Sequence, residues 1–289
     1  MQLSAKSGFT IIEVMIYLAV SGILLSSAYV LITGRQNYSE FTLGIRQIAS
    51  NIRTDISNVS LGYYPSLDLK CQPMRSGGIT ITSTTTPSQG TNNGCQYIGE
   101  AIQFDPNNQP DEYNVYTVAG AEFQGSNNTL VTNLSNSYPV AVPSSVSNSI
   151  QTVTLPYGIH LYSINSNILT QCISVSPAYS YLCPYMFGVY SLTGASSAVN
   201  GSGSVDLVPY CDNKSIKESI AEKYIDSIDN NPNGVCPATD YPPSSDYNPV
   251  SGIVYCFDSS TTNQSGVITI GAGGNPNLVN LTIHSYPCS

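Results

Sequence analysis

One segment near the N-terminus constrains the fold of this chain more than any other. Phe9–Ile32 is apolar over 24 residues and contains a single charged residue, Glu13. A helix of about 20 apolar residues spans a bilayer, so the segment predicts a transmembrane helix. Lys6 precedes it without any acidic residue, which favours an N-terminus held inside. A carboxylate among lipid tails costs several kcal/mol and normally marks function, so Glu13 is a candidate functional residue.

An amphipathic pattern continues beyond the apolar segment and predicts that the helix extends out of the membrane. The apolar residues are spaced three or four apart, as on one face of an α-helix: Phe41, Ile45, Ile48, Ile52, Ile56 and Val59. The helix is expected to end near Gly62, ahead of Pro65. At 1.5 Å per residue it would be about 80 Å long. Its first half can pack with other helices, and its second half can bury the apolar stripe on a globular head.

The N-terminal residues carry a specific resemblance. Gly8-Phe9-Thr10-Ile11-Ile12-Glu13-Val14-Met15-Ile16, with Gly22, resembles the start of type IV pilins, a family that includes pilus subunits and type II secretion pseudopilins. The resemblance implies that residues 1–8 are a leader peptide, cleaved after Gly8 by a prepilin peptidase. Phe9 would then be the new N-terminus, usually N-methylated, and Glu13 would pair with the terminal amine of a neighbouring subunit.

An ordinary signal peptide is the alternative interpretation of the N-terminus. Lys6 would be its charged part, Phe9–Leu25 its apolar core and Ser26-Ser27-Ala28 its cleavage site. A glutamate within the core and a helical pattern that continues past it fit this interpretation poorly. Many pilins have a proline around the position of Val30. Its absence here predicts a more continuous helix, or a subunit that is not the bulk filament protein.

The remaining residues, 63–289, predict an extracytoplasmic head of one large domain or two small ones. Charged residues make up 9% of the chain, which is common among secreted β-rich proteins. From Tyr63 onward there are 5 basic and 15 acidic residues, a net charge of −10. Such a head repels phosphate backbones, so no direct nucleic-acid partner is expected.

Eight cysteines, all in the head, predict disulfides in an oxidising compartment. Pairing between sequence neighbours is the expectation: Cys71–Cys95, Cys172–Cys183, Cys211–Cys236 and Cys256–Cys288. A structural zinc site is the alternative, but the chain has no Cys-x-x-Cys pair and its spacings are scattered.

The head is predicted to be an antiparallel sheet packed on the helix, which makes the fold class α+β. Nine runs have strand character and are separated by Gly, Pro, Asn and Ser: Ile79–Thr82, Ala101–Phe104, Val115–Val118, Gln151–Leu155, Ile159–Ile164, Phe187–Leu192, Gly252–Phe257, Val267–Ile270 and Leu278–His284. One helix is expected in the head, beginning at Asp212 or Asn213 and ending near Asn230, with Ile216, Ile220, Tyr224 and Ile228 on its apolar face.

Two acidic loops are candidate calcium sites. The first holds Asp226, Asp229, Asn231 and Asn233, and the second holds Asp105, Asn107, Asp111 and Glu112. Neither has EF-hand spacing, and Asp and Asn are also ordinary turn formers. No other cofactor or metal is expected.

Catalytic motifs are not apparent in the chain. His160 and His284 lie in strand-like runs, where packing or a partner explains them better than catalysis. No nucleophile elbow, zinc-protease motif or phosphate-binding glycine loop occurs. The chain is therefore not expected to be an enzyme.

Together these features predict a minor pilin of 30.8 kDa, inserted in the cytoplasmic membrane as a single-pass precursor and then carried on a surface filament. Its expected partners are prepilin peptidase, other pilin subunits through the N-terminal helix, and a surface or host-cell ligand. The head would serve assembly initiation, adhesion or motility. The alternatives are a minor pseudopilin, a major pilin with a large head and a membrane-anchored enzyme.

Overall fold

The structure is a computed structural model of the chain. It describes residues 10–62, 69–73, 79–83, 94–124, 129–131, 137–162, 186–191, 205–210, 225, 253–271, 275 and 277–288.

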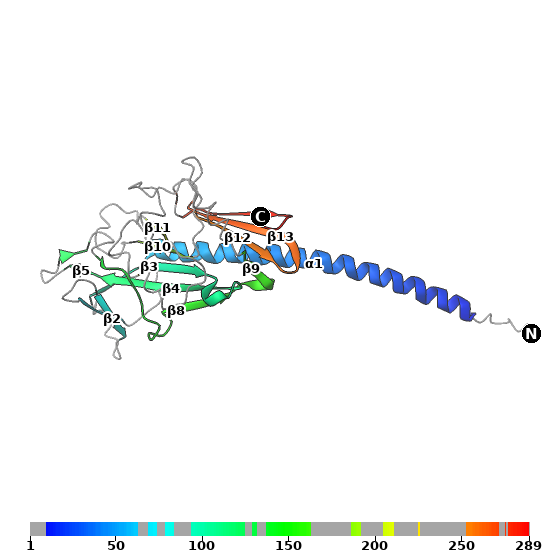
Figure 1. Cartoon of the computed structure of the whole chain (residues 1–289), viewed down its shortest axis with the longest axis horizontal. Helices are drawn as coiled ribbons and strands as arrows, with labels where there is room; N and C mark the ends of the chain where they lie inside the picture. Colours follow the sequence, from blue (N-terminus) through cyan, green and yellow to red (C-terminus); the bar gives the residue numbers. More distant parts are fainter. Residues whose placement is uncertain are drawn as a thin grey trace, which may run out of the picture.

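A single long helix, α1 (Ile11–Leu61), dominates the molecule and runs for 51 residues (Figure 1). It contains no proline, and its continuity agrees with the expectation from the sequence around Val30. Gly62 ends it in the left-handed conformation, with φ 67° and ψ 21°, and its N–H donates to the carbonyls of Asn58 and Val59. Glycine adopts this conformation without a Cβ penalty, which explains why the helix ends where the sequence predicts.

The larger sheet is antiparallel and six-stranded. Its order is β11-β10-β3-β4-β7, and β8 also pairs with β4. The strands are β3 (Cys95–Phe104), β4 (Glu112–Ala121), β7 (Val140–Ala141), β8 (Ile150–Thr154), β10 (Met186–Tyr190) and β11 (Asp206–Tyr210).

A second antiparallel sheet has four strands in the order β14-β13-β12-β9. These are β9 (Ile159–Leu161), β12 (Ile253–Ser259), β13 (Thr262–Ile270) and β14 (Val279–His284). Two hairpins and two short 3-10 turns complete the described elements: β1 (Leu69–Pro73) with β2 (Ile79–Ser83), β5 (Phe123–Gln124) with β6 (Thr129–Leu130), η1 (Pro106–Asn108) and η4 (Pro156–Gly158).

The main hydrophobic core lies where the second half of α1 meets both sheets. All six residues of the predicted apolar stripe are buried, with exposed fractions of 0–2%: Phe41, Ile45, Ile48, Ile52, Ile56 and Val59. Phe104 of the larger sheet packs on Tyr255 of the smaller one, with ring centroids 4.5 Å apart, and on Phe257 at 5.5 Å. The two sheets and the helix therefore share one core, which confirms the predicted α+β class.

Two disulfides fasten chain segments to the sheets. Cys71–Cys95 joins β1 to the start of β3, and Cys256–Cys288 joins β12 to the C-terminal residues. These bonds join the same cysteines as two of the four expected neighbour pairs. The other two expected pairs, Cys172–Cys183 and Cys211–Cys236, lie outside the described residues.

Each of the nine predicted strand runs overlaps a strand of the structure. The prediction missed β1, β5, β6, β7 and β11, which are short and lack a clear alternating pattern. Most of the predicted head helix lies outside the described residues. Ile225 within it is helical and fully buried, although it is not on the predicted apolar face.

A close approach at Gly44 lets the helix pack against the η4 turn. A Cβ at this position would lie 2.5 Å from Cδ1 of Ile159 and 3.0 Å from Cδ2 of Tyr157. Gly34, ten residues earlier on the same helix, has nothing within 4 Å of the same position. Both residues are glycines within α1, so their helix propensity is the same and only their surroundings differ. They therefore form a matched pair for substitution.

Gly44→Val is expected to destabilise the folded protein by about 1–3 kcal/mol, because Ile159 and Tyr157 must move to admit the new side chain. Gly34→Val is the control, since it makes the same change where space is open. Denaturant unfolding of the full chain in detergent, followed by near-ultraviolet circular dichroism, measures both. Equal unfolding midpoints for the two variants would contradict the close approach.

Candidate functional site

The first turn of α1 is built around Thr10 and Glu13. Thr10 has extended backbone angles, φ −75° and ψ 150°, and its hydroxyl accepts a hydrogen bond from the Glu13 N–H at 3.3 Å. This is the N-cap geometry, and Glu13 occupies the N3 position of a Thr-x-x-Glu sequence pattern. A carboxylate in the first turn also interacts favourably with the positive end of the helix dipole. The sequence analysis missed this second role, although the Thr10–Glu13 spacing signals it.

The first half of α1 projects away from the head and is exposed (Figure 1). Ile11 is 80% exposed, Leu25 71% and Ile32 65%. Among the described residues, α1 is long and apolar enough to cross a membrane by length and composition, and none of its most apolar stretch is buried. Such a surface requires either lipid or other apolar helices around it.

The serine hydroxyls of this half, and that of Thr33, are satisfied within the helix itself. Ser26, Ser27 and Thr33 each donate to the carbonyl oxygen four residues earlier, at 2.9 Å. Ser21 makes the same bond to the carbonyl of Tyr17. Polar groups need such internal partners in lipid, because no water is present to bind them. Glu13 is the one charged side chain of this apolar segment.

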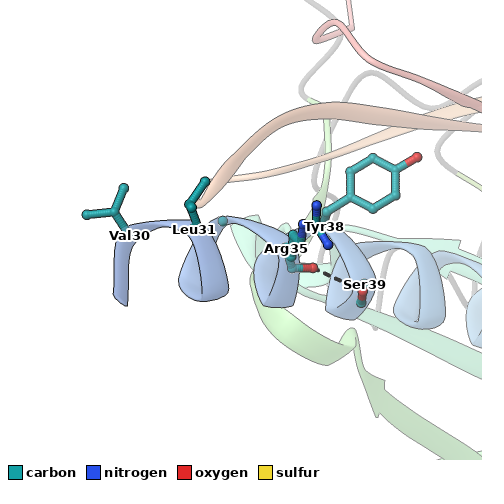
Figure 2. A pocket seen from close by; sticks show the side chains of 6 residues that line it. Val30, Leu31, Arg35, Tyr38 and Ser39 are labelled. Atoms are coloured by element: carbon teal, nitrogen blue, oxygen red, sulfur yellow. Dashed lines mark hydrogen bonds between the residues drawn. The ribbon is translucent and has the colours of Figure 1, made fainter. Parts of the chain in front are cut away.

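A shallow hollow marks the passage from the exposed half of α1 to the half that the head covers (Figure 2). Its lining comes from one face of the helix: Val30, Leu31, Gly34, Arg35, Tyr38 and Ser39. The Ser39 hydroxyl donates to the Arg35 carbonyl at 3.0 Å. None of these side chains is an acid, a thiol or an imidazole, so the hollow offers packing surface and hydrogen bonds from Arg35 and Tyr38.

Several predicted site residues lie outside the part of the chain that the structure describes. They are the processing residues Gly8 and Phe9 and the calcium candidates Asp226, Asp229, Asn231 and Asn233. Among the described residues, no three His, Cys, Asp or Glu side chains are grouped so that they could hold a metal ion.

The second acidic loop, from Asp105 to Glu112, forms an ordinary turn. The N–H of Asp105 donates to the Glu112 carbonyl at 3.1 Å, which closes the loop around η1. Asp105 and Asn107 have positive φ, 54° and 56°. Asp and Asn tolerate this region better than other residues, so their presence follows from the turn itself.

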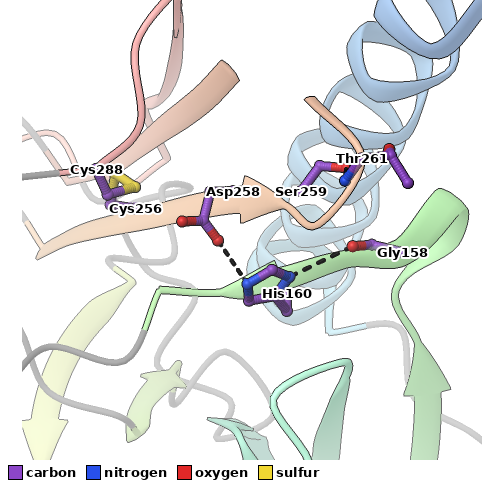
Figure 3. A network of polar contacts seen from close by, with 7 residues as sticks. All are labelled: Gly158, His160, Cys256, Asp258, Ser259, Thr261 and Cys288. Carbon is purple, nitrogen blue, oxygen red and sulfur yellow. Dashed lines mark hydrogen bonds and ion pairs between the residues drawn. A yellow bond between two sulfur atoms is a disulfide. The ribbon is translucent and has the colours of Figure 1, made fainter. Parts of the chain in front are cut away.

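His160 is held by a carboxylate on the neighbouring strand (Figure 3). Its Nε2 lies 2.7 Å from Oδ1 of Asp258, and its Nδ1 lies 3.4 Å from the carbonyl oxygen of Gly158. The two residues form a cross-strand pair between β9 and β12. The hydroxyl of nearby Ser259 contacts Thr261 at 2.9 Å and not the imidazole. Both ring nitrogens thus face protein acceptors, which makes this a structural pair and not a nucleophile with its base.

His284 has a packing role as well. Its ring lies 4.9 Å from that of Tyr286, centroid to centroid. Both histidines are therefore engaged by neighbours, as the sequence analysis expected.

The comparisons with known proteins agree with the geometry of α1. Residues 3–29 match the family described as prokaryotic N-terminal methylation motif. No curated protein and no solved structure matches the chain. The N-terminal segment of the chain is thus type IV pilin-like in carrying this motif. The motif implies processing by prepilin peptidase, a membrane-inserted helix and assembly with other pilin subunits, and proteins of this class are typically structural.

His160→Gln is expected to change the free energy of unfolding by about 1 kcal/mol or less, because a partly exposed ion pair between neighbouring strands contributes little. A double-mutant cycle with Asp258→Asn measures the coupling through the midpoint of chemical unfolding. A coupling energy well above about 1 kcal/mol would contradict the structural assignment. A hydrolytic activity of the wild type that is lost in either variant would contradict it as well.

Proposed function

We propose that this chain is a minor subunit of a type IV pilus, anchored and assembled through α1. The observation that carries the proposal is Glu13, a lone charge in the exposed apolar half of α1, located in the first turn of that helix. A charge in lipid costs about 2.5–3.5 kcal/mol by insertion scales, and a cationic partner relieves that cost.

Processing after Gly8 would supply such a cation. The new N-terminus at Phe9 would directly precede the N-cap residue Thr10, at the end of the helix where Glu13 lies. The ammonium group of one subunit and the Glu13 carboxylate of its neighbour would then neutralise each other in the membrane. Such a pair also sets the axial register between the two helices, since both charges are at defined positions along α1.

The division of α1 supports assembly through its first half. The head covers the apolar stripe from Phe41 to Val59, whereas the residues before Ile32 remain exposed. Parallel helices from several subunits could bury these exposed side chains against one another after leaving the bilayer. The hollow at Gly34 and Tyr38 lies at the level where a neighbouring helix would pass the edge of the head.

The size and charge of the head support a minor role. The head takes up most of a 30.8 kDa chain, and a large head is easier to place at a filament tip or at low copy number than along a shaft. Its net negative charge opposes direct capture of nucleic acid. The head would then contribute to assembly initiation, adhesion or motility.

Quantitative mass spectrometry of isolated surface filaments tests the proposal. A mature N-terminus at Phe9, present in a small fraction of the filament subunits, is the expected result. Dominance of this chain would make it the major pilin. Absence from surface filaments together with a Phe9 terminus in the periplasm would indicate a pseudopilin, and cleavage after Ala28 would indicate an ordinary secreted protein.

Glu13→Ala is expected to leave membrane insertion and cleavage intact and to reduce incorporation into filaments by about tenfold or more, because the ammonium of a neighbour loses its partner in lipid. Glu40→Ala is the matched control. Glu40 also lies on α1, where its carboxylate accepts a hydrogen bond from Gln36 at 2.8 Å. Immunoblots of membrane and filament fractions give both readouts. Equal incorporation of the two variants would contradict the assembly role of Glu13.

A further inference from the structure

A second acidic feature lies at the other end of α1, in the contact between the helix and the larger sheet. Asp55 of α1 is partly buried beside the core residue Ile56, and Glu100 of β3 is only 9% exposed. The Tyr97 hydroxyl of β3 acts on the Glu100 carboxyl. Oε2 of Glu100 accepts no hydrogen bond in the described part of the protein.

A β-bulge directs Tyr97 and Glu100 to the same side of the sheet. Residues three apart on a regular strand face opposite sides. In β3 the register shifts between Tyr97 and Gly99, so that Ile98 is an extra residue relative to β4. Because of this extra residue, the side chains of Tyr97 and Glu100 lie on the same side of the sheet. Bulges commonly redirect side chains in this way. Tyr97 packs against the main core around α1, whereas Ile98 belongs to the core on the opposite face.

Among the described residues, the groups that interact electrostatically around Asp55 and Glu100 include no cationic side chain. Asp55 comes from α1, Tyr97 and Glu100 from β3, and Tyr113 from β4. Asn51 of α1 donates to the Tyr113 hydroxyl at 3.4 Å. The nearby cation of α1, Arg53, is directed to β14, where Nη2 and Nε donate to the Val279 carbonyl at 2.6 and 3.1 Å.

We propose that Asp55 and Glu100 form a proton-linked latch, which holds the end of α1 in the head while the pair retains a proton and loosens when both carboxyls ionise. The helix packs on β3, and both carboxyls lie at least partly buried at this contact. Two neighbouring carboxylates in such a place cannot both be charged without a penalty. A proton between helix and sheet removes the repulsion. On the proposed function, which places the head outside the cytoplasm, this latch makes the attachment of the head to its helix depend on external pH.

The electrostatics give the direction of this dependence. Burial raises the pKa of Asp55 from 3.8 to about 6. Burial, and then the charge of Asp55, raise the pKa of Glu100 from 4.5 to about 7, against the opposing hydrogen bond from Tyr97. Both pKa values are higher in the folded protein than in the unfolded chain. The stabilising protons are therefore fully held at acidic pH, and stability falls as pH rises through about 6 to 7.

The test measures unfolding of the full chain in detergent micelles at pH 5 and pH 8, for the wild type and for Glu100→Gln. The wild-type unfolding constant is expected to rise by about tenfold or more between the two pH values, since one pKa unit corresponds to a tenfold change. The amide of Gln cannot ionise, so Glu100→Gln is expected to lose most of this rise and to be more stable than the wild type at pH 8.

Glu112→Gln is the control, because it neutralises an acid at the start of β4 outside the cluster and should keep the wild-type pH response. Asp55→Asn provides a second variant from the opposite side of the contact. If Glu100→Gln and Asp55→Asn both keep the full pH response, the latch is wrong. If Ca²⁺ or Mg²⁺ stabilises the wild type at pH 8 but not Glu100→Gln, the pair binds a cation, and the proton-linked proposal is also overturned.

An infrared titration tests the same pair without unfolding the protein. The carbonyl stretch of a protonated carboxyl should persist in the wild type at pH values where ordinary Asp and Glu are ionised, and should decrease in Glu100→Gln. A wild-type spectrum in which every carboxyl ionises below pH 5 would overturn the proposal even if the variants failed to fold.

Discussion

The fold depends on burial of one face of the second half of α1 between two antiparallel sheets. Phe41, Ile45, Ile48 and Ile52 are 0–1% exposed, and side chains of both sheets surround them. Each such burial contributes roughly 1.5–3 kcal/mol relative to exposure. Phe104 and Tyr255 join the two sheets and lie in the same core cluster as the buried side chains of α1. Without the helix, these aromatic residues would lose part of the surface that buries them. The helix is therefore part of the head as well as its anchor.

This burial also divides α1 into two halves with different surroundings. The backbone continues without a break, but the head covers the helix only from about Phe41 onward, and the earlier apolar residues require lipid or neighbouring helices. Because one rigid element connects both halves, the position of the head follows directly from how the exposed half is packed. A filament subunit needs this property, since its head must be presented at a defined place outside the bundle.

Carboxyl groups occur at both ends of the helix, and the negative charge of each is neutralised in a different way. Glu13 lies in the first turn, where the helix dipole and the Thr10 cap are favourable, and its full neutralisation is proposed to come from another subunit. Asp55 and Glu100 interact electrostatically within the same chain, and a proton is proposed to neutralise that pair. Neutralisation of Glu13 is thereby linked to assembly. Protonation of Asp55 and Glu100 is linked to the packing of the helix on the head.

The sequence by itself determined the helix, because its features are local: a continuous apolar segment, a stripe with a spacing of three or four, and the glycine at position 62. It also indicated the N-terminal motif, the strand-rich head and the neighbour pairing of Cys71–Cys95 and Cys256–Cys288, whose sequence separations are short. Only the tertiary structure decided the order of the strands, the division into two sheets and the meeting of Asp55 with Glu100. Those depend on contacts between residues far apart in the chain and on a bulge at Ile98, and neither leaves a periodic pattern along the sequence.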